Sequence, residues 1–96
     1  MVFRFRSQPR LTIPGGIVQG GIVASMLDMG MAFAADRIST VTLHVDYLRP
    51  AVGPVLTVTA DVTRRGSRIV FIEAVMVDQD GRVIAKGRQT AVPIDD

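Results

Sequence analysis

The sequence predicts an α+β domain in which one apolar helix packs against a curved antiparallel sheet of about five strands. Residues 20–35 form an apolar stretch in which Asp28 is the single ionisable side chain, which is typical of a helix buried on all sides. From Thr40 onward, apolar residues recur at every second position, which is typical of half-buried strands. A helix of the first kind packed on strands of the second kind is an α+β architecture.

The first half of the chain supplies one strand and the helix. A short strand is expected at residues 2–6, followed by a loop over residues 7–19 that contains two prolines and two glycines. The helix is expected to begin at the pair Gly20 and Gly21 and to end near Asp36, where the apolar run stops.

The second half predicts four strands in a meander, and these strands cover residues 40–47, 55–63, 69–77 and 82–92. The period of two places four apolar side chains on one face of the first of these strands, namely Val41, Leu43, Val45 and Tyr47. The segment Asp78-Gln79-Asp80-Gly81 is a hairpin signal, since its glycine tolerates positive φ.

Composition indicates one domain that associates with copies of itself. The chain has 96 residues, and a chain this short often gains stability by oligomerising. Hydrophobic residues make up 48% of it, and we interpret this excess as a buried subunit interface. Residues 13–35 are long enough for a membrane span, but their glycines and the central Asp28 argue against one.

Charge and reactive residues narrow the function classes. Ten of the eleven basic residues are arginines, and arginine favours bidentate contacts with phosphates. The nine acidic residues and the few aromatic ones argue against nucleic-acid binding. The absence of cysteine excludes thiol nucleophiles and fits a cytoplasmic protein, and with His44 as the single histidine no metal site is expected.

The segment that leads into the predicted helix reads Gly16-Ile17-Val18-Gln19-Gly20-Gly21, and the helix carries an acid at Asp28. This pattern resembles the hot-dog-fold acyl-CoA thioesterases of the phenylacetate-pathway (PaaI-like) type. In that family His-Gly-Gly or Gln-Gly-Gly opens the central helix, and an acid follows nine positions after the His or Gln, as Asp28 follows Gln19. Further matches are Thr40-Val41-Thr42-Leu43, Tyr47-Leu48-Arg49-Pro50, Arg64-Arg65-Gly66 and Asp78-Gln79-Asp80-Gly81-Arg82-Val83-Ile84-Ala85. The resemblance extends from about residue 2 to residue 92 and implies hydrolysis of a coenzyme A thioester.

Two residues carry the expected chemistry. A carboxylate in an apolar cleft, such as Asp28, can act as general base on water or as nucleophile on the thioester carbonyl. Its alternative role is a structural acid that accepts hydrogen bonds from a partner loop. Backbone N–H groups at the helix N-terminus are free to bind an oxyanion, and the resemblance implies that Gly20 supplies this N–H. The alternative is a glycine turn required by packing.

Further site residues follow from the resemblance. Gln19 is expected to orient the thioester or the water, or else to face solvent, and Gly21 permits close approach of substrate. Thr40 lies where related enzymes have a Ser or Thr near the attacking water, or it is an ordinary strand-edge threonine. The basic turn is expected to bind coenzyme A phosphates or to be a solvated hairpin, and it contains Arg65, Gly66, Ser67 and Arg68.

The spacing of the two main residues predicts a shared site. Gly20 and Asp28 lie about 12 Å apart along one helix, so one chain does not easily bring both to one carbonyl. Family members combine the glycine loop of one subunit with the acid of another, which implies a homodimer or a homotetramer built as a dimer of dimers. No cofactor is implied apart from the coenzyme A of the substrate.

The sequence departs from the family pattern in two ways. The family usually carries an extra N-terminal helix, and we interpret its absence as an N-terminal truncation of the single domain 1–96. An Asn often stands six residues before the His or Gln, and this position is Ile13.

Three rival functions remain. Because of these departures, one is a protein that binds acyl-CoA without hydrolysing it. The second is a hot-dog enoyl-CoA hydratase, in which His44 would have to serve as the catalytic histidine. The third is a purely structural oligomer whose cleft is empty.

Overall fold

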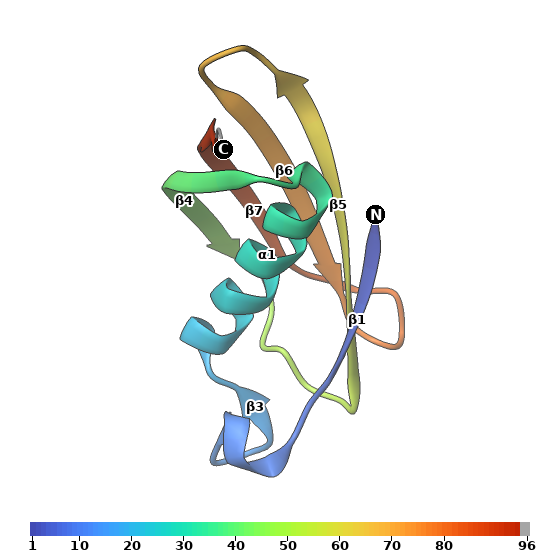
Figure 1. Ribbon diagram of the computed structural model, residues 1–96. Coiled ribbons are helices and arrows are strands. Elements are labelled where there is room, and N and C mark those ends of the chain that lie inside the picture. The colour runs from blue at the N-terminus through green and yellow to red at the C-terminus, as the bar shows by residue number, and fades with distance from the viewer. Residues whose placement is uncertain (95–96) are drawn as a thin grey trace.

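The computed structural model describes residues 1–94 and contains one long helix and seven strands (Figure 1). The helix α1 spans Gly20–Ala35, at the position that the sequence predicts. The main strands are β1 (Val2–Arg6), β4 (Ile38–Tyr47), β5 (Val55–Arg65), β6 (Val70–Val77) and β7 (Val83–Pro93). Figure 1 shows α1 lying across one face of the sheet that these five strands form.

The sheet order is β1-β5-β6-β7-β4, and all neighbours are antiparallel. The predicted meander of four strands is therefore wrong in one respect, because only β5, β6 and β7 form it. After α1 the chain turns through Asp36 and Arg37, both with positive φ, and enters the far edge as β4. Residues 48–54, which include Pro50 and Pro54, then carry the chain back to β5. This connection leaves β4 as an edge strand.

Residues 7–19 are more ordered than the predicted loop. They contain a short 3-10 helix (Pro9–Leu11) and a ladder between β2 (Thr12–Ile13) and β3 (Ile17–Val18). Two backbone bonds fix their end, from the Val18 N–H to the Ala51 carbonyl (2.8 Å) and from the Gln19 N–H to the Leu11 carbonyl (3.1 Å). The start of α1 is thus held in place by backbone bonds.

One face of α1 packs against the sheet to form the core, and the helix lies close to β5. At Gly30 an added Cβ would lie 3.0 Å from the Val58 side chain on β5, so a glycine lets the helix approach the strand. The buried residues of the helix recur every three or four positions, as expected for one face, and they are Val23, Met26, Leu27, Gly30, Met31 and Ala35.

The opposite face of α1 is apolar and exposed, which corrects the prediction of a helix buried on all sides. Met29 is 47% exposed and Phe33 is 61% exposed. The reason is that the sheet covers only one side of the helix. Within residues 1–94, no helix is long and apolar enough to cross a membrane.

The β6–β7 hairpin forms as predicted, with Gly81 at a φ of 80°. The carboxylate of Asp78 accepts hydrogen bonds from the Asp80 and Arg82 backbone N–H groups and pairs with the Arg82 guanidinium at 3.0 Å. Burial opposes ionisation of Asp78, but these partners outweigh it and hold the pKa of this carboxyl below its usual value of 3.8.

Candidate active site

The candidate acid is held by two strands. Asp28 is half-buried on α1, and its Oδ1 accepts a hydrogen bond of 2.5 Å from Gln89 Nε2 on β7. The Thr40 hydroxyl on β4 lies 3.4 Å from the same oxygen. Among the described residues, Oδ2 of Asp28 has no hydrogen-bond partner. The arrangement leaves one carboxylate oxygen available to a water or a thioester.

A β-bulge places Thr40 beside the acid. Thr40 pairs with Ala91 and Thr42 pairs with Thr90, so Val41 is the extra residue on β4. A bulge of this kind re-aims a side chain. Without it, Thr40 and Thr42 would share one face of the sheet. With it, Thr40 reaches Asp28 on the α1 side, whereas Thr42 lines a hollow on the outer side.

Gln89 is a site residue that sequence reasoning missed. Its side chain is 2% exposed, and its Oε1 has no hydrogen-bond partner in the part of the chain that the structure describes. A buried unpaired polar atom costs about 1–3 kcal/mol. The signal was present in the sequence, because Gln89 is the polar member of the small apolar row Ala85, Gly87, Gln89 and Ala91 on β7.

The helix N-terminus supplies free donors. Gly20 and Gly21 are the first residues of α1, and neither N–H has an acceptor within residues 1–94. The Tyr47 hydroxyl donates to the Gly20 carbonyl at 2.6 Å, which ties the start of α1 to the end of β4. Gln19 is exposed at the N-cap position and makes no capping bond with its side chain.

Packing within the chain does not require either glycine. An added Cβ at Gly20 would lie 3.5 Å from the Tyr47 ring, which is ordinary contact. An added Cβ at Gly21 would lie 3.7 Å from the flexible side chain of Gln19, and neither glycine has positive φ. The alternative of a glycine turn that packing requires therefore has no support within residues 1–94.

An apolar hollow of about 350 Å³ adjoins Gly20. Tyr47 and Arg49 form its more polar rim, and the remaining lining residues are Ile17, Val18, Val23, Leu48, Pro50, Ala51 and Ile84. Pockets of this size and lining suit small apolar groups. The hollow therefore lies where an acyl group near the helix N-terminus would need space.

The structure does not bring the two main candidates together within one chain. Asp28 follows Gly20 by eight positions on the helix, which corresponds to about 12 Å. Each lies near a different end of β4, Asp28 beside Thr40 and Gly20 beside Tyr47. The candidate acid and the candidate oxyanion donors therefore lie apart within one chain.

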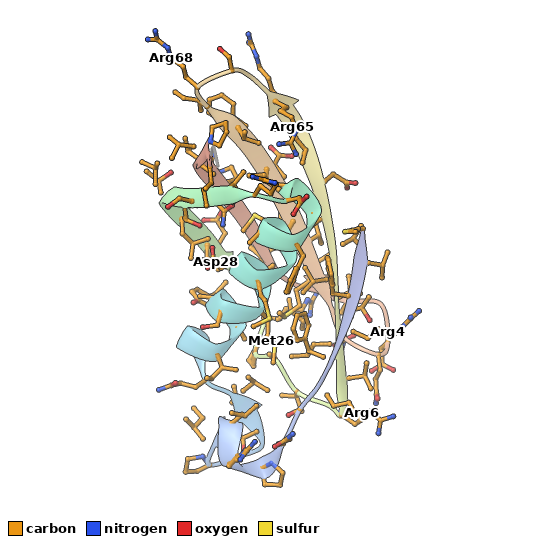
Figure 2. The ribbon with its side chains drawn as sticks, viewed as in Figure 1. Arg4, Arg6, Met26, Asp28, Arg65 and Arg68 are labelled. Carbon is orange, nitrogen blue, oxygen red and sulfur yellow. The ribbon has the colours of Figure 1, made fainter. Side chains whose placement is uncertain are left out.

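The basic turn, which we now call the basic hairpin and which contains Arg65, Gly66, Ser67 and Arg68, lies beyond the C-terminal end of α1 and away from its N-terminal end (Figure 2). The Arg65 guanidinium donates a short hydrogen bond to the Ala35 carbonyl, the last of the helix. An added Cβ at Gly66 would lie 2.9 Å from the Ile69 carbonyl oxygen, so the tight turn itself explains this glycine. Ser67 and Arg68 are exposed.

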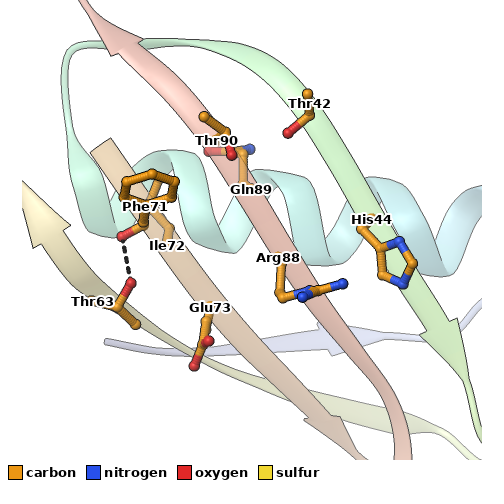
Figure 3. Close-up of a pocket in the computed structure, with 9 residues that line it drawn as sticks. All are labelled: Thr42, His44, Thr63, Phe71, Ile72, Glu73, Arg88, Gln89 and Thr90. Carbon is orange, nitrogen blue, oxygen red and sulfur yellow. Dashed lines mark hydrogen bonds between the residues drawn. The ribbon is translucent and has the colours of Figure 1, made fainter. Parts of the chain in front are cut away.

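His44 lies on the opposite face of the sheet from Asp28. It bonds to Asp46 at 2.9 Å and lines a hollow of about 410 Å³ with Glu73 and Arg88. Figure 3 shows this hollow with α1 behind the sheet. The sheet therefore separates His44 from Asp28, so one chain does not form the acid–histidine pair of the hydratase alternative. Within residues 1–94, no three His, Asp or Glu side chains gather as a metal ion would require.

The sequence matches the family model of the thioesterase superfamily over residues 15–85. The chain belongs to this superfamily. A provisionally named esterase of Saccharolobus solfataricus is 33% identical over 78 residues, covering 75% of this chain and 56% of that protein. The medium/long-chain acyl-CoA thioesterase YigI of Salmonella typhimurium is 27% identical over 94 residues, covering 77% of this chain and 61% of that protein. The chain thus spans less than two thirds of either relative.

Solved structures confirm the predicted fold. The PaaI protein of E. coli, from the phenylacetic acid degradation operon, has a TM-score of 0.92 to this chain. The match covers 98% of this chain and 72% of that protein at 22% identity. One helix against a five-stranded antiparallel sheet is therefore the hot-dog fold that the motifs around Gln19 and Asp28 indicate.

Proposed function

We propose that this superfamily member is an acyl-CoA thioesterase that hydrolyses aryl or medium-chain thioesters at a site shared by two copies of the chain. The observation that carries the proposal is the pair of unused groups, namely the free Oδ2 of Asp28 and the free N–H of Gly20. Thioester hydrolysis needs one group of each kind, because a proton or an acyl group is taken up while an oxyanion forms.

The reaction uses these groups in one of two ways. In the first, the Asp28 carboxylate takes a proton from water as the water oxygen bonds to the thioester carbon. In the second, the carboxylate attacks that carbon itself, and water later cleaves the resulting anhydride. In both, the Gly20 N–H stabilises the carbonyl oxygen as it becomes negative, and the C–S bond breaks to release the coenzyme A thiolate.

The position of β4 supports a shared site. Among the described strands, β4 has a partner only on its β7 side, and an edge of ten residues is a template for pairing with a second copy. In an antiparallel pair about a two-fold axis near Leu43 and His44, Thr40 of one copy lies opposite the partner's Tyr47. The pairing would bring Asp28, held beside Thr40, to the same end as the partner's Gly20, held beside Tyr47.

Exposed apolar surface supports the same association. Val41 and Leu43 on β4 are 59% and 40% exposed, and Met29 and Phe33 on α1 are exposed as well. Apolar patches of this kind mark interaction sites. We propose that a second interface joins two such dimers into a tetramer. We also propose that the protein is cytoplasmic.

The basic hairpin is proposed to contact the coenzyme A phosphates. Val70, at its end, pairs with Ala91, which in turn pairs with Thr40, so the hairpin lies at the end of the sheet that holds the acid. Ser67 and Arg68 are exposed there and suit phosphate binding, beside the helix-capping Arg65. The apolar hollow near Gly20 is proposed to hold the acyl group.

Thiol release from a panel of aryl and straight-chain acyl-CoAs tests the function. Turnover by the wild type that falls by about 10²-fold or more in Asp28→Asn, with the oligomer intact, is the expected result. Equal turnover in both proteins would contradict the role of Asp28. Binding of acyl-CoA without turnover would favour the non-catalytic alternative, and Ile13→Asn then checks for a weakened enzyme, since a sharp gain in activity would restore the catalytic account.

A further inference from the structure

We propose that Gln89 is a positioning residue, which holds one oxygen of the Asp28 carboxylate so that the other faces the reacting group. The inference rests on the proposed thioesterase function and deepens it. It assigns a role to a residue on the last strand that lies outside the glycine loop, the central helix and the basic hairpin. Gln89 is 2% exposed and donates its amide N–H to Asp28 Oδ1 at 2.5 Å.

The demands of the core do not explain an amide at this position. The neighbouring residues on the same face of β7 are small, and the cross-strand neighbours of Gln89 are the apolar Ile72 on β6, which is buried, and Leu43 on β4. An amide placed there leaves its Oε1 buried without a partner within residues 1–94, which an apolar side chain would avoid. The contact with Asp28 is the feature that an apolar side chain does not reproduce.

The contacts of Gln89 indicate how it would act on Asp28. An ionised carboxylate only accepts hydrogen bonds, so the amide must present its N–H to it. Gln89 and Thr40 both approach Oδ1 from different strands, and Gln89 is the closer and more buried of the two. Holding one oxygen fixes the rotation of the Asp28 carboxylate and leaves Oδ2 toward the reacting group. Misorientation of a catalytic group lowers turnover more than substrate binding.

The test replaces Gln89 with a side chain of similar length that lacks the amide. For Gln89→Met, we expect kcat to fall about tenfold or more while KM stays within about twofold. The melting temperature should stay level or rise, since the unpaired oxygen is removed. Ile72→Val is the matched control, because it loosens the same part of the core and should lower the melting temperature without changing kcat. Gln89→Leu repeats the test with a second apolar side chain.

A double variant separates positioning from independent action. In the Asp28→Asn background, Gln89→Met should cause no further loss of kcat, because Gln89 acts through Asp28. The inference is overturned if Gln89→Met and Gln89→Leu keep wild-type kcat, or if the full loss recurs in the Asp28→Asn background. An active wild type that depends on Asp28 but not on Gln89 would overturn this inference alone. A wild type inactive on every thioester would overturn the proposed function with it.

Discussion

The two ends of the α1–β4 pair differ in whether the chain itself supplies hydrogen-bond partners to the candidate site residues. At one end, which we call the carboxylate end, Asp28 is bound by Thr40 and Gln89 from two strands. At the other, the glycine end, Tyr47 fixes the Gly20 carbonyl while the N–H groups of the helix start point to no acceptor within residues 1–94. The chain thus supplies hydrogen-bond partners for its candidate acid but, within residues 1–94, none for the N–H groups of the helix start.

We expect the largest effect from removing a backbone N–H donor at the glycine end. Gly20→Pro removes the N–H at the first helical position, where proline is well tolerated. Gln19 has φ −58° and ψ 142°, which suits a residue before proline. We expect kcat to fall by about 10²–10³-fold, the cost of one oxyanion donor, as measured by thiol release.

Gly20→Ala is the matched control, because it keeps the N–H and adds one methyl group. That methyl would sit 3.5 Å from the Tyr47 ring, so the fold should accept it. Its kcat should fall much less than that of Gly20→Pro. Equal losses in the two variants would mean that the glycine provides space rather than a donor, and the comparison of the two ends would need revision.

We expect a smaller effect from removing the hydrogen bond that fixes the glycine end to β4. Tyr47→Phe removes the 2.6 Å bond to the Gly20 carbonyl and keeps the ring. We expect the free energy of unfolding to fall by about 0.5–1.5 kcal/mol, measured by urea titration. We also expect kcat to fall only several-fold, because the N–H remains. A loss as large as that of Gly20→Pro would give Tyr47 a direct role in the chemistry.

The smallest effect on activity is expected away from both ends, at Asp78. Because its pKa is lowered in the folded state, its charge stabilises the fold above about pH 4, and this contribution is lost as the pH falls through the folded-state pKa. Asp78→Asn should therefore be less stable than the wild type at pH 7, with the gap closing below about pH 4. Thermal melts across pH check this, and kcat should not change. A gap that widens at low pH would contradict the assignment.

Local patterns predicted the elements well, because each depends on neighbouring residues. The apolar run with Asp28 gave the helix, the glycine pair gave its start, and alternation gave the strands. The pairing of β4 with β7 was missed because consecutive strands usually pair, and residues 48–54 carry no signal that they cross to β5. The exposed face of α1, with Phe33, was missed because composition does not distinguish burial in the chain from burial by a second chain.

The sequence indicated part of the candidate site, and the contacts that complete it depend on the fold. The resemblance supplied Asp28, Gly20 and Thr40, but the contact of Thr40 depends on a bulge at Val41 that no pattern in the strand marks. Gln89 reaches Asp28 across 61 residues of sequence, and a contact of that range follows from topology rather than from spacing.

Mixing two inactive variants tests the central claim that the two ends meet between copies. Asp28→Asn and Gly20→Pro are unfolded and refolded together, and thiol release is compared with each variant alone. In a two-fold dimer with shared sites, half of the dimers are mixed and each has one intact site, so activity should return to about a quarter of the wild-type value. No recovery, with mixed dimers shown to form, would contradict the account and place the acid and the donor of each site in one chain.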